Sequence, residues 1–311
     1  MEKHVGIIGK GMIGISWAVM FTGNGIGVKV LAKEPELGYK RYRTYYDDLV
    51  ENGLVTKKQA EACENLLSFT QDYNDLKDER IIFECVKEDI ATKFEVYEKI
   101  EESCENLIAI GSSTSSISPD DLAKGVKHKE KILVAHPWNP PHLVPLVELV
   151  RNDYSDEKAI GALKEILEYA GRKVVMMNKP APGFIGNRLQ HALYREAVYM
   201  VEQGICTPED IDKAIRYSFA PRYTSIGLFD HFDYAGLDMI KSIDDYLFPT
   251  LCNAETTQDL INERFNRGDL GYKTGIGVYD WRERDMDDFR KRASAPFLEF
   301  FNWKLPEEIE E

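Results

Sequence analysis

The 311-residue sequence predicts an α/β domain with a mostly parallel sheet over residues 1-182, followed by an all-α domain over residues 183-311. Three observations predict this division. In the first half, short apolar runs alternate with helical segments, a pattern typical of a parallel sheet covered on both faces. After residue 183, β-branched runs become scarce and helical patterns follow one another. Between the two halves lies Pro180-Ala181-Pro182-Gly183, a cluster typical of a domain boundary.

Hydrophobic patterning places each element. In the first half we expect strands at 4–8, 27–31, 80–84, 106–110, 131–135, 145–150 and 172–176, and helical segments at 12–23, 36–64, 89–103 and 156–170. In the second half we expect helices at 184–204, 208–219, 234–248 and 256–268. The helix at 208 has the clearest start, because Thr207 can cap it, Pro208 suits its first position and two acids follow.

Composition excludes several classes of protein. A net charge of -14 argues against general affinity for nucleic acid or an anionic membrane. The five cysteines are scattered and never form a Cys-x-x-Cys pair, which predicts reduced thiols, a cytoplasmic protein and no metal site. The N-terminus lacks a signal-peptide pattern. The longest uncharged run, 11–28, is glycine-rich and short for a membrane span, so no membrane association is expected.

The segment Gly9-Lys10-Gly11-Met12-Ile13-Gly14 carries a Gly-x-Gly-x-x-Gly pattern between a predicted strand and a predicted helix. In that context the first glycine makes a tight turn, the second lets the backbone approach a pyrophosphate, and the third lets helix pack on strand. The helix N-terminus then faces the phosphates. This pattern predicts a Rossmann-type domain whose dinucleotide site includes Gly9, Gly11, Met12, Ile13 and Gly14.

The end of the second strand leaves the choice of dinucleotide open. An acidic residue is expected there to bind the adenine ribose hydroxyls, but the position holds Ala32, followed by Lys33 and Glu34. The missing carboxylate at position 32 removes a repulsion of the 2′-phosphate of NADP, and the neighbouring Lys33 attracts that phosphate. If Glu34 reaches back to the ribose, NAD is favoured instead. The predicted cofactor is therefore NAD or NADP, with Lys33 as a candidate contact.

His136 and Glu148 are the first candidates for proton chemistry. His136 ends an apolar run, and Glu148 lies within the next one. A carboxylate in an apolar strand needs a partner, since burying it unpaired is costly. A histidine oriented by a carboxylate is a suitable general base. The alternative is a purely structural pair.

Two polar segments are expected near this pair. The turn 112–116 is rich in hydroxyls and directly follows a strand, so it should lie at the carboxyl edge of the sheet, where ligands bind. Asn187, at the start of the long helix of the second half, can orient a carbonyl oxygen. The alternatives are ordinary turn and helix-cap chemistry.

Five motifs in order resemble the 3-hydroxyacyl-CoA dehydrogenase family: Gly-x-Gly-x-x-Gly, Ser-Ser-Thr-Ser, His-Pro-x-Asn-Pro, Leu-Val-Glu and Gly-Phe-Ile-x-Asn-Arg-Leu. The resemblance covers essentially the whole chain. It implies a catalytic serine at Ser115, a base at His136, an orienting acid at Glu148 and an asparagine at Asn187. It also implies cofactor-side residues, which are Glu88, Lys93 and Ser113.

Within this family the sequence is similar to the branch of lambda-crystallin and L-gulonate 3-dehydrogenase, with the L-carnitine dehydrogenases next. Ser113 stands where the acyl-CoA enzymes carry asparagine, which weakens an acyl-CoA assignment. The branch implies a substrate pocket with Trp138 and Asn139, and suggests Arg222 as the partner of a substrate carboxylate. An ordinary salt bridge is the alternative for Arg222.

The sequence therefore predicts an NAD(P)-dependent oxidoreductase that moves a hydride between the 3-hydroxyl carbon of a small 3-hydroxy acid, gulonate- or carnitine-like, and the cofactor. One alternative is a short-chain 3-hydroxyacyl-CoA dehydrogenase. A remote alternative is a non-enzymatic, crystallin-like structural protein. The expected partner is a small molecule, and the family implies a homodimer.

Overall fold

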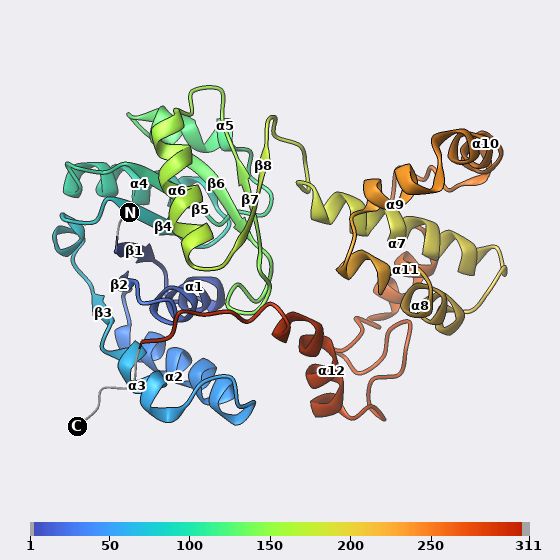
Figure 1. Ribbon diagram of the computed structural model, residues 1–311, viewed down its shortest axis with the longest axis horizontal. Coiled ribbons are helices and arrows are strands. Elements are labelled where there is room, and N and C mark those ends of the chain that lie inside the picture. Colours follow the sequence, from blue (N-terminus) through green and yellow to red (C-terminus); the bar gives the residue numbers. More distant parts are fainter. Residues whose placement is uncertain (1–2, 307–311) are drawn as a thin grey trace. The chain divides into compact units, whose positions relative to one another are not determined.

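The computed structural model describes residues 3–306, and the chain forms two compact units (Figure 1). The first comprises Met1–Ile185 and the segment that begins at Arg290, and the second comprises Gly186–Phe289. The predicted fold class, a Rossmann-type sheet domain and an all-α domain, is confirmed. The first boundary lies three residues beyond the predicted 182.

The first unit is built on an eight-stranded sheet with the order β3-β2-β1-β4-β5-β6-β7-β8. The strands are β1 (His4–Ile8), β2 (Gly27–Leu31), β3 (Leu67–Thr70), β4 (Ile81–Glu84), β5 (Ala109–Ser112), β6 (Ile132–Pro137), β7 (Leu146–Val150) and β8 (Lys173–Met177). Neighbouring strands are parallel except for β6 and β7, which are antiparallel. This single reversal decides the geometry of the site below.

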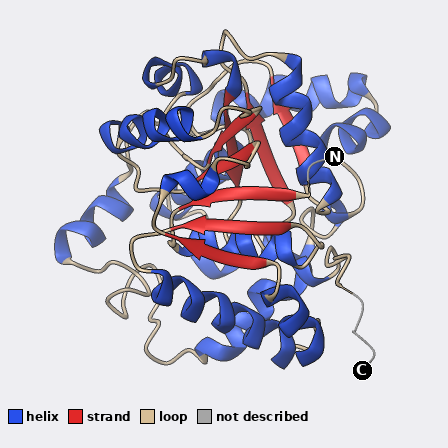
Figure 2. Cartoon of the chain, turned by 90° about the vertical axis from the view of Figure 1, so that its left-hand side faces the viewer, coloured by secondary structure: helices blue, strands red, loops and turns tan. Residues whose placement is uncertain are grey.

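Helices cover both faces of the sheet (Figure 2). They are α1 (Met12–Thr22), α2 (Pro35–Glu51), α3 (Lys57–Glu64), α4 (Ile90–Ser103), α5 (Pro119–Leu122) and α6 (Glu157–Tyr169). Side chains alternate between the two cores: Ile7 packs in the core that contains α1, α2 and α6, whereas its neighbour Ile8 packs in the core that contains α4 and α5.

Some elements of the first unit differ from the predictions, and the short helix α5 is one that was not predicted. The edge strand β3 was not predicted. The predicted strand 106–110 lies further along, at Ala109–Ser112. The predicted helical segment 36–64 is two helices, because Gly53 adopts a positive φ of 71° and Thr56 with Gln59 forms a capping box that starts α3.

The second unit contains the helices α7 (Gly186–Glu202), α8 (Pro208–Tyr217), α9 (Leu228–Ala235), α10 (Leu237–Leu247) and α11 (Asp259–Arg267). The predicted helix 234–248 is interrupted at Gly236, whose φ is 97°. Among the described residues of this unit only Val198 is fully buried. The second unit therefore has almost no core of its own.

The end of the described chain departs from the predicted range 183-311 of the helical domain. After α12 (Met286–Leu298) the chain packs against the first unit (Figure 1). The Trp303 ring lies against Gly23, at the end of α1, where a side chain would collide with it. The Lys304 N–H donates to the Asn24 side-chain oxygen at 3.1 Å. None of the described helices combines the length and apolarity needed to cross a bilayer.

Candidate active site

The glycine loop has the shape that a dinucleotide requires. A side chain at Gly14 would collide with the Gly9 carbonyl oxygen, and Gly9 itself has a φ of 122°, so packing and backbone geometry demand both glycines. A Cβ at Gly11 would meet nothing within 4 Å, which leaves that side of the loop open to a ligand. The first turn of α1 contains no acidic residue and offers N–H groups to phosphate. The loop therefore fits a pyrophosphate.

A carboxylate does lie beside this loop, although not at the strand end. The Glu34 Oε2 atom is 2.7 Å from the Lys10 ammonium, inside the glycine motif. Ala32 is buried and Lys33 is exposed. Glu34 thus supplies a carboxylate beside the loop, and a carboxylate in such a place is suited to ribose hydroxyls and repels a 2′-phosphate.

Ser113 contacts α1, the helix that begins at the glycine loop. Its hydroxyl accepts a hydrogen bond from the Trp17 indole at 3.1 Å and contacts the Cys85 sulfur at 3.4 Å. Burial raises the pKa of the Cys85 thiol to about 12, so this cysteine stays neutral. In the described structure these three side chains are engaged with one another.

A buried ion pair holds the end of β4. The Lys93 ammonium donates to both oxygens of Glu84, at 2.8 and 2.9 Å, and both side chains are essentially unexposed. Tyr97 and Ser112 also donate to Glu84, at 2.8 and 2.6 Å. Because a buried carboxylate without partners would be costly, this network explains why charges are tolerated here. The sequence had offered no signal for Glu84, and the proposed cofactor contact of Lys93 stays a prediction.

Glu88 organises the turn that carries Ser115. Its carboxylate accepts hydrogen bonds from the backbone N–H groups of Ser115 and Ser116, at 3.0 and 3.1 Å, and from the Thr114 hydroxyl. Burial raises the pKa of Glu88, but these hydrogen bonds and the nearby Lys93 ammonium outweigh it, and the pKa is lowered. Ser115 is exposed at the carboxyl edge of the sheet, beyond the end of β5.

His136 and Glu148 face each other across β6 and β7, where the antiparallel register pairs them directly. The His136 Nδ1 atom is 2.8 Å from the Glu148 Oε2 atom, and Glu148 is fully buried. The Ile185 backbone N–H donates to the other oxygen, Oε1, at 2.8 Å. The Trp138 indole N–H donates to Oε2 at 3.3 Å. Both oxygens of the carboxylate are therefore held, and the imidazole is held by one of them.

The remaining imidazole nitrogen is the chemically useful one. With Nδ1–H donating to a carboxylate, Nε2 carries the lone pair and can accept a proton. The Phe184 ring packs on the imidazole, with ring centres 5.1 Å apart. Phe184 is buried and has a positive φ of 51°, an unusual backbone for a non-glycine residue. The motif at 183–189 had drawn attention to Asn187, and the contacts of Phe184 and Ile185 were missed.

The remaining predicted residues lie apart from this pair or in the second unit. Asn139 is exposed and precedes a cis peptide bond to Pro140. Asn187 lies in the first turn of α7. Arg222 is exposed, and its guanidinium donates to the His231 Nε2 atom at 2.8 Å. His231 had not been singled out from the sequence.

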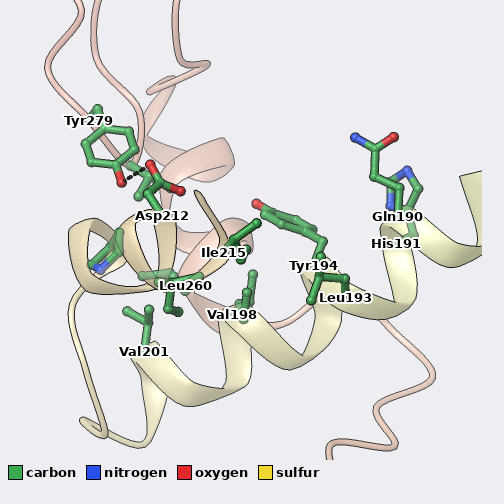
Figure 3. A pocket seen from close by; sticks show the side chains of 14 residues that line it. Gln190, His191, Leu193, Tyr194, Val198, Val201, Asp212, Ile215, Leu260 and Tyr279 are labelled. Atoms are coloured by element: carbon green, nitrogen blue, oxygen red, sulfur yellow. Dashed lines mark hydrogen bonds between the residues drawn. The ribbon is translucent and has the colours of Figure 1, made fainter. Parts of the chain in front are cut away.

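A separate apolar cavity of about 520 Å³ lies within the second unit, between α7, α8 and α11 (Figure 3). The Tyr279 hydroxyl donates to Asp212 at 2.8 Å on its rim. None of the predicted catalytic, cofactor or substrate residues lines this cavity. It is therefore distinct from the site built around His136.

Two family models match successive parts of the chain. Residues 4–180 match the 3-hydroxyacyl-CoA dehydrogenase NAD binding domain, and residues 183–281 match the 3-hydroxyacyl-CoA dehydrogenase C-terminal domain. The chain belongs to the 3-hydroxyacyl-CoA dehydrogenase family. It is thus a dehydrogenase that uses NAD and acts on a secondary alcohol. The predicted family is confirmed, and of the two predicted cofactors the comparisons support NAD.

Relatives of the dehydrogenase include proteins named for L-carnitine and for 3-hydroxybutyryl-CoA. The L-carnitine dehydrogenase of Oceanobacillus iheyensis is 36% identical over 75% of this chain and 76% of its own length. The 3-hydroxybutyryl-CoA dehydrogenase of Mycobacterium tuberculosis is 32% identical over 90% of this chain and 98% of its own. The solved structure of 5-formyl-3-hydroxy-2-methylpyridine 4-carboxylic acid 5-dehydrogenase, described as an NAD+ dependent dismutase, has a TM-score of 0.84 at 25% identity and covers 96% of this chain and 97% of its own.

Proposed function

We propose that this dehydrogenase oxidises the 3-hydroxyl carbon of a small, free 3-hydroxy acid of the carnitine or gulonate type, with His136 as the base. The contact between His136 Nδ1 and Glu148 Oε2 at 2.8 Å is the observation that carries the proposal. It presents Nε2 to a substrate hydroxyl and stabilises the imidazolium that forms when the proton arrives. Ser115 and Asn187 are proposed to hydrogen-bond the substrate oxygen.

The cofactor site is proposed to consist of the glycine loop, the first turn of α1 and Glu34. Bound NAD supplies the two-electron oxidation of the alcohol carbon. The chain supplies the binding surface, the orientation of the alcohol and the acceptor for its proton. We propose that Glu34 replaces the missing strand-end acid, because its carboxylate already lies at the loop through Lys10.

Arg222 is the proposed anchor for the substrate carboxylate. A guanidinium binds a carboxylate through two parallel hydrogen bonds, and a contact with His231 fixes its orientation. The name of the carnitine-dehydrogenase relative supports a free carboxylate as substrate. Replacing Arg222 with lysine keeps the charge but removes the planar fork, so the KM for the acid should rise while the KM for NAD stays unchanged.

The second candidate is a short-chain 3-hydroxyacyl-CoA dehydrogenase. It is favoured by the 3-hydroxybutyryl-CoA dehydrogenase relative, which aligns over 98% of its own length. Both candidates use the same histidine and glutamate, so the site geometry alone does not separate them. A crystallin-like structural role remains the distant alternative, and any turnover excludes it as the sole role.

A substrate screen tests the proposal directly. Short 3-hydroxy acids, carnitine, gulonate and 3-hydroxybutyryl-CoA are each assayed as alcohols to be oxidised, with NAD and with NADP, and the reduced nicotinamide is followed by absorbance. We expect a kcat/KM at least tenfold higher for a free acid than for the CoA thioester, equivalent to about 1.4 kcal/mol. A preference for 3-hydroxybutyryl-CoA would establish the second candidate instead.

The family implication of a homodimer is also a proposal. The second unit has one fully buried residue and exposes many large apolar side chains, including Leu193, Phe229, Leu237 and Ile243. A second copy of the chain would cover such a surface. Light scattering after size exclusion should give twice the chain mass of 35.6 kDa. A monomer at assay concentrations would contradict it.

A further inference from the structure

The loop between β6 and β7 is fixed at two points, and one of them is on the helix that begins at the glycine loop. His142, in this loop, is buried, and so is Ser16 of α1. The His142 Nδ1 atom lies 2.6 Å from the Ser16 hydroxyl, and the His142 backbone N–H donates to the same hydroxyl at 3.0 Å. The Tyr45 ring packs on the imidazole at 4.8 Å.

The hydrogen bonds fit a neutral His142. The Ser16 oxygen accepts the backbone N–H, and with the ring proton on Nε2 the Ser16 hydroxyl donates its own hydrogen to Nδ1. Burial, and secondly the charge of Arg172, lower the pKa of His142 to about 4, which agrees with a neutral ring. The Arg172 guanidinium donates to the Pro141 carbonyl at 3.1 Å and holds the other side of the loop.

The same loop begins with Trp138, which contacts the proposed catalytic pair. Its indole N–H donates to the Glu148 Oε2 atom that also binds His136. Its backbone N–H continues the β6–β7 ladder by donating to Leu146 at 3.3 Å. The Trp138 ring is half-buried. Because its backbone is fixed by the ladder, the loop holds the indole N–H close to the Glu148 carboxylate.

We propose that Trp138 is a positioning residue for the His136–Glu148 pair. The hydrogen bonds between His142 and Ser16, called the lock below, keep Trp138 in place. The indole prevents the Glu148 carboxylate from turning away from His136. The lock joins the helix of the cofactor loop to the loop beside the base. This inference rests on the proposed role of His136 as the base.

Trp138→Phe tests the contact, because it keeps the aromatic ring and removes the N–H. We expect kcat to fall about tenfold, equivalent to about 1.4 kcal/mol, while the Kd for NAD changes less than about twofold. The proton signal of His136 Nδ1–H, observed by NMR without cofactor or substrate, should shift. Trp303→Phe is the matched control, because the buried Trp303 N–H has no hydrogen-bond partner in the described part of the chain.

Ser16→Ala tests the lock. We expect Ser16→Ala to lower kcat and to shift the same His136 signal. In the double variant with Trp138→Phe, it should lower kcat little further, because both changes act on one contact. A Trp138→Phe enzyme with wild-type kcat and an unchanged His136 signal would overturn the proposal. So would a double variant whose loss of kcat equals the product of the losses in the two single variants. Full activity of His136→Ala would instead refute the proposed function. The His136 Nδ1–H signal, compared between the wild type and Trp138→Phe, would still report on the Trp138 contact.

Discussion

Replacing His142 with asparagine should remove a defined part of the pH dependence of stability. Asparagine places an oxygen where Nδ1 now accepts the Ser16 hydroxyl, but it does not titrate. Burial, followed by the charge of Arg172, lowers the pKa of His142 from 6.5 to about 4 in the folded protein. The unfolded chain therefore takes up a proton as the pH falls below 6.5, whereas the folded protein does so only near 4.

The sign and size of the effect follow from this difference. The free energy of unfolding falls as the pH drops from 6.5 to 4, at up to about 1.4 kcal/mol for each pH unit, so His142 contributes a loss of about 3 kcal/mol. Urea unfolding, followed by circular dichroism between pH 7 and pH 4, measures it in the wild type and the variant. The wild type should lose about 3 kcal/mol more than His142→Asn, and the exposed His128→Asn serves as control. Parallel curves for wild type and His142→Asn would refute the buried, neutral state of His142.

Three further predictions concern the cofactor half of the site. Gly11→Ala should keep the wild-type Tm but weaken NAD binding measured by calorimetry, because the added methyl group contacts no protein atom and enters only the space left for the ligand. Gly14→Ala should weaken NAD binding and also lower the Tm, because its methyl group would collide with Gly9. Glu34→Ala should lower the ratio of kcat/KM for NAD to kcat/KM for NADP about tenfold or more, because the ribose loses one charged hydrogen-bond acceptor. An unchanged ratio would show that Glu34 does not bind the ribose. The Cys85 thiol, with a pKa raised to about 12 by burial, should resist alkylation of the folded protein at pH 8. Alkylation of the peptide that contains Cys85, found by mass spectrometry after digestion, would contradict that burial.

The sequence allowed the His136–Glu148 pair to be predicted from residue types alone. A carboxylate within an apolar strand demands a partner, and the histidine twelve positions earlier was the nearest candidate. The antiparallel direction of β6 and β7, which pairs the two residues in register, could not be predicted from short apolar runs. The contact of Trp138 with Glu148 depends on that register as well, so it too was out of reach.

Other features depend on contacts between distant parts of the chain. The edge strand β3 has only four residues, and two of them, Ser68 and Thr70, are polar, so it lacks the continuous apolar run that marks the buried strands. Lys93 lies in a charged helix and would ordinarily be assigned to the surface, but Glu84 makes its burial possible. The return of the C-terminal segment depends on the fit of Trp303 against Gly23, which are 280 positions apart. Each of these requires tertiary structure, which local patterning does not contain.

The most direct test of the central claim is the rate of alcohol oxidation in His136→Gln, measured in single turnover with the preferred 3-hydroxy acid. The amide can still hydrogen-bond but cannot accept the proton. We expect the rate to fall by about 10²- to 10⁴-fold, with the Kd for NAD unchanged. A His136→Gln enzyme that oxidises the alcohol at close to the wild-type rate would show that His136 is not the base.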